Sequence, residues 1–190
     1  MRPGAAWGAV GAVALLLASG VAVATAPGNA RIIAPLLVRG GVGDTMTGRT
    51  LIAEVTQVRL AEALDVKYRD AGDTSTDGVW VVVDATLTAT EKILGFTDAE
   101  LRIGDVIFTP SHVLPSPTLM TLRYGAGIPE HGSLVFEIPL SALDQPGASA
   151  ALLVFRNDNL DSTPALQVDL TALEIEPRVR VDEIYVADRE

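Results

Sequence analysis

The sequence predicts an all-β fold, an antiparallel β-sandwich, preceded by one N-terminal hydrophobic helix. Three observations lead to this prediction. After Arg2, no charged residue occurs before Arg31. The remaining chain is divided into short segments rich in β-branched residues, separated by Gly, Pro, Asp and Asn. Helical periodicity is nearly absent beyond residue 26.

The hydrophobic helix is expected within residues 1–26, and its apolar run covers residues 7–25. At 1.5 Å per residue, this run is about long enough to cross a hydrocarbon core of about 30 Å. A retained transmembrane anchor, in contact with membrane lipid through residues 7–25, is favoured because the run exceeds a usual signal core. A cleaved signal peptide stays an alternative, because Arg2 gives a basic start and Ala22-Val23-Ala24 fits an exit site. The third alternative is a helix buried in a soluble protein.

We expect the C-terminal domain to lie outside the cytoplasm, on a single-pass membrane protein or on one secreted after signal cleavage. Three arginines follow the apolar run and only Arg2 precedes it, so a positive-inside count alone gives the opposite orientation. Long domains, however, cross membranes largely regardless of charge. The chain has no cysteine, so a thiol-linked lipid anchor and disulfides are excluded.

Composition limits the size and the partners of the domain. The 190 residues have a net charge of −10, with Lys67 and Lys92 as the only lysines. This balance argues against nucleic acid as a partner, because phosphate neutralisation needs clustered Lys and Arg. Without the anchor and a linker, the chain is long enough for one ordinary domain with its own core.

The first element after the anchor is a linker over residues 27–49, expected to dock onto a sandwich formed by residues 50–190. Within the sandwich, strand patterns are predicted over residues 50–60 and 63–68, and a polar loop follows over residues 69–77.

The clearest strand covers residues 79–90, where Val, Ala and Leu alternate with more polar residues. Val79, Val81 and Val83 begin its core face. Trp80 and Val82, on the opposite face, indicate that both faces are covered at the start of this strand.

A hairpin is predicted over residues 101–108, with Gly104-Asp105 at its turn. Residues 97–101 are expected to form one short helical turn. Three prolines place residues 109–117 in a loop. The remaining strands are predicted over residues 133–139, 150–155, 165–170 and 179–186. Short strands with turns at this spacing are typical of a sandwich.

Four local patterns occur in a familiar order: Ala34-Pro35-Leu36 before Gly40-Gly-Val-Gly43, Val79 to Thr86, the hairpin from Leu101 to Phe108, and Gly132-Ser-Leu-Val-Phe-Glu-Ile-Pro139. This order resembles the immunoglobulin-like domains of unknown function that follow signal peptides, lipid anchors or single membrane helices in bacterial envelope proteins. The resemblance covers about residues 34–172. It implies an immunoglobulin-like sandwich and an envelope location, and the family has no established catalytic residues. This chain departs from the lipoprotein members by lacking an anchor cysteine, and a C-terminal extension begins at about residue 174.

No catalytic constellation is evident, so we expect a non-enzymatic protein without a cofactor. His112 and His131 lie in Pro-rich or Gly-rich stretches, and both are expected to be solvated loop side chains. Neither Ser111 nor Ser133 is flanked by a nucleophile elbow, and no metal-binding His-Glu-x-x-His spacing is present.

Two acidic loops are weak candidates for calcium, through Asp70, Asp73 and Asp77 and through Asp158. Neither loop has EF-hand spacing, and such residues also favour turns for local reasons.

Two functions are therefore expected. The first is an extracytoplasmic binding or accessory module, tethered to the membrane, whose partner is another envelope or membrane protein such as a transporter component. The alternative is a ligand-binding or sensing domain for a divalent cation or an envelope glycan.

Overall fold

The computed structural model describes residues 35–66, 74–91, 94–95, 98–114, 118–156, 162–181 and 185–186. The chain divides into two compact units, Met1–Ala34 and Pro35–Glu190. The predicted hydrophobic helix falls in the first unit and lies outside the described residues. Within the described ranges, no helix is both long enough and apolar enough to cross a bilayer.

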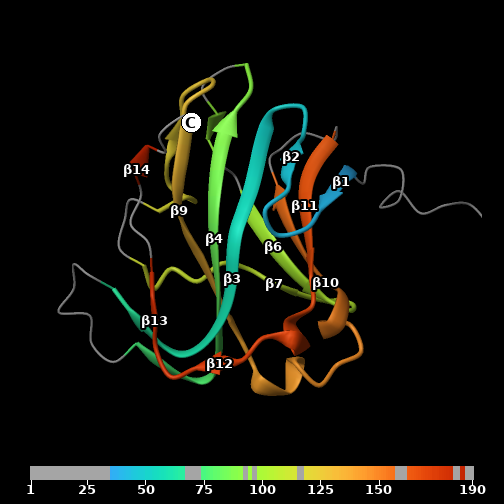
Figure 1. The fold of residues 1–190 in the computed structure, drawn as a ribbon, viewed down its shortest axis with the longest axis vertical. Helices are drawn as coiled ribbons and strands as arrows, with labels where there is room; N and C mark the ends of the chain where they lie inside the picture. Colours follow the sequence, from blue (N-terminus) through green and yellow to red (C-terminus); the bar gives the residue numbers. More distant parts are fainter. Residues whose placement is uncertain are drawn as a thin grey trace, which may run out of the picture. The chain divides into compact units, whose positions relative to one another are not determined.

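The second unit contains a five-stranded sheet (Figure 1). In spatial order its strands are β1 (Leu36–Gly40), β11 (Ser162–Val168), β10 (Ala151–Arg156), β6 (Asp98–Ile103) and β7 (Val106–Phe108). Strand β1 runs parallel to β11, and the other neighbours are antiparallel.

The other sheet is built on a long antiparallel hairpin, β3 and β4, extended by β9 (Figure 1). Short strands pair along its two edges. Its strands are β12 (Ile175–Glu176), β3 (Leu51–Asp65), β4 (Ser75–Ala89), β9 (Pro129–Ile138) and β14 (Tyr185–Val186), with β2 (Thr45–Thr47) and β13 (Val179–Arg180) also paired to β3.

Short elements connect the sheets. Strands β5 (Leu94–Gly95) and β8 (Arg123–Tyr124) form a two-stranded ladder. Three 3₁₀ turns, η1 (Leu140–Ala142), η2 (Ala148–Ala150) and η3 (Leu170–Ala172), precede or follow strands β9 to β11.

The main core lies between the two sheets and confirms the predicted all-β sandwich. Every second residue of β4 from Val79 to Ala89 is buried in it, and these residues pack with Leu101, Leu153 and Phe136 from β6, β10 and β9. The period of two in the sequence therefore identified the core face of β4. Pro139 follows β9 directly, because proline has no amide hydrogen to continue the ladder.

A second hydrophobic cluster covers the outer face of the β3–β4–β9 sheet. Trp80 and Val82 of β4 pack there with Val135 of β9 and with Val179 and Val181 of the C-terminal extension. The indole Nε1 of Trp80 donates a hydrogen bond to the carbonyl of Thr74 at 2.9 Å. The prediction that both faces are covered at the start of β4 is confirmed.

Some sequence predictions about local structure are wrong. The helical turn predicted over residues 97–101 is replaced by strand from Asp98, where β6 begins. In the sequence, Thr97 and Glu100 have the spacing of a helix capping box. In the structure, Ala99, Leu101 and Ile103 alternate into the core, and the strand pairs with β10.

The two strands predicted over residues 50–60 and 63–68 are also wrong, because one continuous strand, β3, covers Leu51–Asp65. Its pairing with β4 has two register shifts, one between Val55 and Gln57 and one between Ala61 and Ala63.

The hairpin of β6 and β7 is confirmed. Gly104 has φ of 58°, which the tight turn requires and which glycine adopts without strain. The segment expected as a docking linker contains β1 and β2, which join the five-stranded sheet and the β3 edge respectively.

Candidate functional site

A buried polar network lies at the centre of the outer face of the β3–β4–β9 sheet. Asp84 of β4 is only 3% exposed. Its Oδ2 accepts a hydrogen bond from Arg59 Nη2 at 2.5 Å, and its Oδ1 accepts one from Ser133 Oγ at 2.5 Å. Ser133 is the register partner of Asp84 on β9, and β3 supplies Arg59. Arg59 Nη2 also donates to the carbonyl oxygen of Arg180 at 3.1 Å, which links the network to the C-terminal extension.

His131 lies on the same sheet face, two residues before Ser133 on β9. It is buried, and its Nδ1 shares a hydrogen bond of 3.1 Å with the hydroxyl of Thr86, its register partner. The expectation of a solvated loop histidine is therefore wrong for His131. Gly132 and Pro129 suggested a loop, but the alternation of His131, Ser133 and Val135 on the outer face is that of a strand.

A cavity of about 150 Å³ lies beside β9, where residues of the segments 110–114 and 118–121 line it. Its lining includes Ser133, Leu114 and Met120, and His112, which is exposed, also borders it. The backbone N–H of Ser111 donates to the carbonyl of Val135 at 2.8 Å and holds the segment 110–114 against β9. The space is large enough for one ring-sized group.

The outer face of the five-stranded sheet contains a second buried carboxylate, Glu100 of β6, which is 5% exposed. Arg102 donates to its Oε2 through Nε at 3.0 Å and Nη2 at 2.6 Å, and Arg156 Nη1 donates to its Oε1. Burial raises the pKa of Glu100, but the hydrogen bonds and charges of Arg102 and Arg156 outweigh it and lower the pKa below 4.5. Glu100 is therefore ionised at neutral pH.

The chemistry available to these groups follows from their pairing. The Asp84 carboxylate is paired with Arg59 and accepts a hydrogen bond from the Ser133 hydroxyl. Glu100 is held between two guanidinium groups in the same way. In both places the ion pairs link neighbouring strands of one sheet.

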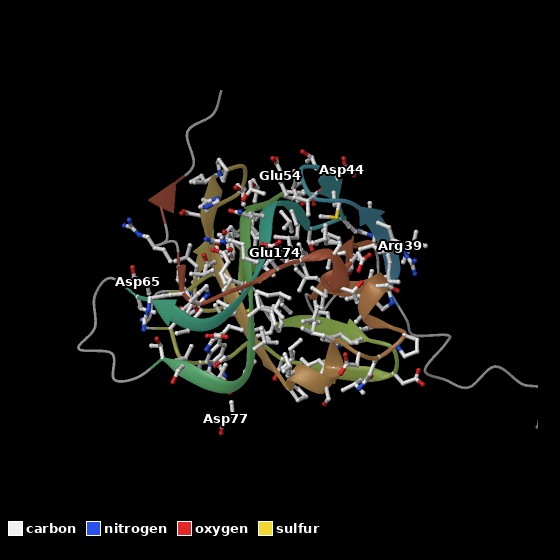
Figure 2. The ribbon with its side chains drawn as sticks, turned by 60° about the horizontal axis from the view of Figure 1, so that its bottom comes forward. Arg39, Asp44, Glu54, Asp65, Asp77 and Glu174 are labelled. Atoms are coloured by element: carbon white, nitrogen blue, oxygen red, sulfur yellow. The ribbon has the colours of Figure 1, made fainter. Side chains whose placement is uncertain are left out.

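The predicted calcium ligands are only partly placed. Asp77 is exposed near the start of β4, at the lower margin of Figure 2. Asp70, Asp73 and Asp158 lie outside the described residues. In the part of the chain that the structure describes, no three His, Asp or Glu side chains are grouped to hold a metal ion.

Sequence reasoning missed Arg59, Asp84 and Ser133 as one network. The available signal was a carboxylate and a hydroxyl inside strand patterns, where buried polar groups need partners. Their pairing depends on the order of β3, β4 and β9 in the sheet, which the sequence alone does not provide.

No family model and no curated protein matches this chain. Among solved structures, an uncharacterised β-sandwich protein from Clostridium difficile 630 is similar at 9% identity, with a TM-score of 0.46, over 70% of this chain and 93% of that one. The secreted protein MPT63 from Mycobacterium tuberculosis is similar at 14% identity, with a TM-score of 0.46, over 70% of this chain and 97% of that one. These similarities concern the sandwich architecture and leave the function open.

Proposed function

We propose that this chain is a non-enzymatic extracytoplasmic module of a bacterial envelope, tethered to the cell membrane through residues 7–25, that binds another envelope or membrane protein such as a transporter component. One observation is central to the proposal. The chain divides after Ala34, and an apolar segment of bilayer length, residues 7–25, precedes a compact β-sandwich that begins at Pro35. An anchor followed by a folded module is the arrangement expected of a tethered binding domain.

The connectivity supports an immunoglobulin-like form of the sandwich. In that fold one sheet has the order A-B-E-D and the other the order C-F-G. Here β3, β4 and β9 fit A-B-E, while β6, β10 and β11 fit C-F-G. This assignment leaves no counterpart of strand D among the described strands, and β1 is an addition at the edge of β11.

The pairing of the buried charges supports a rigid binding module. Among the described residues, the buried carboxylates Asp84 and Glu100 are each engaged by arginine. We propose that these ion pairs hold neighbouring strands in register and serve the rigidity of the domain.

The experiment is recovery of partners from a mild detergent extract of the native membrane, with the full chain as bait. The matched control is the full chain with Val83→Asp, which places a charge in the sandwich core and unfolds the domain while leaving residues 7–25 intact. The proposal expects one stoichiometric partner that the control loses. Recovery of no stoichiometric partner, or equal recovery by both baits, contradicts it.

A second candidate function, ligand binding, is favoured by the cavity beside β9. Its lining combines apolar side chains such as Leu114 and Met120 with polar residues such as Ser133 and Thr121. A single sugar ring, which carries both apolar and hydroxyl groups, matches this size and chemistry. Calorimetric titration with N-acetylglucosamine tests it, with Ser133→Ala as the control. Heat that the variant loses supports this candidate, and no heat with the native chain removes it.

A further inference from the structure

The outer face of the five-stranded sheet has at least partly exposed side chains on all five strands. The pairing register and the alternation with core residues define this face. We call it the arginine face, and its exposed or partly exposed members are Leu37 and Arg39 of β1, Gln167 of β11, Leu152 and Arg156 of β10, Arg102 of β6 and Ile107 of β7.

The charge of this face is opposite to that of the whole protein. The chain has a net charge of −10, yet the described side chains of the arginine face include three arginines and one carboxylate, the buried Glu100. The backbone register also brings Asp98 opposite Arg156. The arginines are the accessible charges, since the side chains of Arg102 and Arg156 are 35% and 50% exposed and that of Glu100 is 7% exposed.

Glu100 also positions two of these arginines. It accepts from Arg102 through one oxygen and from Arg156 through the other, so both guanidinium groups are held at the sheet surface. A guanidinium group fixed in this way loses little conformational freedom when it binds an oxyanion. Arginine forms paired hydrogen bonds with phosphate oxygens.

The sequence limits how far the start of β1 can be from the proposed anchor. Residues 7–25 are the proposed anchor, and about ten residues separate them from β1, a length that reaches at most about 35 Å. Strand β1 is an edge of the sheet that forms the arginine face. It contributes the exposed Arg39 to this face. Figure 2 shows Arg39 beside β1 on one side of the domain and Asp65 on the opposite side.

We infer that the arginine face docks onto the anionic phospholipid headgroups of the membrane that holds the anchor. This inference rests on the proposed tether, and it adds an orientation of the domain and a lipid preference. The arginines meet the headgroup phosphates, and the exposed Ile107 contributes apolar contact at the interface. Negative charges on other faces oppose this approach weakly, because the Debye length at physiological salt is about 8 Å.

The absence of cysteine makes a direct test possible, because one introduced thiol is a unique labelling site. The full chain is reconstituted into vesicles that contain a quencher on the lipid headgroup. A fluorophore is attached at Gln167→Cys on the arginine face or, as the control, at Asp65→Cys, an exposed residue at the end of β3. Vesicles of phosphatidylcholine alone are compared with vesicles containing about 30% phosphatidylglycerol.

Docking predicts at least about twofold stronger quenching at Gln167 in the anionic vesicles, reversed by 1 M salt, where the Debye length is about 3 Å. Quenching at Asp65 should not depend on lipid charge. Equal quenching at Gln167 in both vesicles, or an equal increase at both positions, overturns the inference. Failure of the proposed tether is distinguished by flotation, because a chain without an anchor does not float with neutral vesicles.

Two charge variants connect the effect to the arginines. Arg39→Gln leaves Glu100 and its partners untouched, and it should reduce the lipid-dependent quenching. The triple variant Glu100→Gln, Arg102→Gln and Arg156→Gln removes the ion pairs together, so no buried charge is left alone. It should abolish the lipid dependence, and full retention of that dependence in both variants contradicts the inference.

Discussion

Arg59 and Asp84 form an ion pair on a diagonal of the β3–β4 ladder. Their register partners are Val82 and Gln57, so the guanidinium group reaches past its own partner to the next outward residue of β4. The pair lies where the C-terminal extension begins to cover the sheet, because Arg59 also donates to the carbonyl oxygen of Arg180. It therefore joins three parts of the chain that are distant in sequence.

Removal of one partner of this pair is expected to lower the stability of the domain. Arg59→Met leaves the Asp84 carboxylate buried beside only the Ser133 hydroxyl, and it should lower the free energy of unfolding by about 3 kcal/mol. Chemical denaturation of the full chain in detergent measures this. The double variant Arg59→Met and Asp84→Leu is the control and should recover most of the loss. A single variant as stable as the native chain would show that the pair contributes nothing.

The ion pairs of Glu100 predict a loss of stability in acid. Its pKa is lowered by folding, so the native state binds fewer protons than the unfolded state near pH 4.5. The stabilisation is fully present well above pH 4.5 and is lost as the pH falls through the lowered native pKa. The stability difference between the native chain and Glu100→Gln should therefore be constant near neutral pH and shrink below pH 4.5. Parallel pH dependences of the two proteins would contradict this.

Gly78 is expected to be intolerant of any side chain. A Cβ atom placed there would lie 2.3 Å from the carbonyl oxygen of Ile138, a backbone atom of the neighbouring strand. Gly78→Ala should therefore force β4 and β9 apart and cost about 1–3 kcal/mol of stability. Gly41→Ala is the matched control, because its Cβ meets only a side-chain oxygen of Asp44 at 3.5 Å. Thermal unfolding of both variants decides whether the close approach exists.

The C-terminal extension is expected to be an integral part of the domain. Val179→Asp places a charge against Trp80 and Val82 and should expose this second cluster, with a red shift of Trp80 fluorescence and a loss of at least about 2 kcal/mol. Ile175→Asp is the comparison, since Ile175 is already 39% exposed. Similar behaviour of the two variants would mean that the extension does not cover the sheet as described.

The sequence predicted the features that depend on local periodicity. Strand β4 alternates with a period of two, so its core face could be read before the structure was known. Gly104 marked the β6–β7 turn, because a positive φ is available to glycine without strain.

The features that depend on long-range pairing were not predictable from the same patterns. Strand β6 has a local helix-like start, and its pairing with β10 and β7 overrides it. His131 has Gly132 beside it, and its pairing with β4 and β14 makes it part of a strand. The networks of Asp84 and Glu100 each join residues from two or three strands, whose order in space is a property of the whole fold.

The most direct test of the central claim, a sandwich held at the membrane by its own anchor, is the intact mass of the protein purified from its native membrane. Retention of the anchor predicts the mass of the uncleaved chain, 19.9 kDa. A mass lacking the residues up to Ala24 would contradict the claim, because the protein would then be a released envelope protein without a tether.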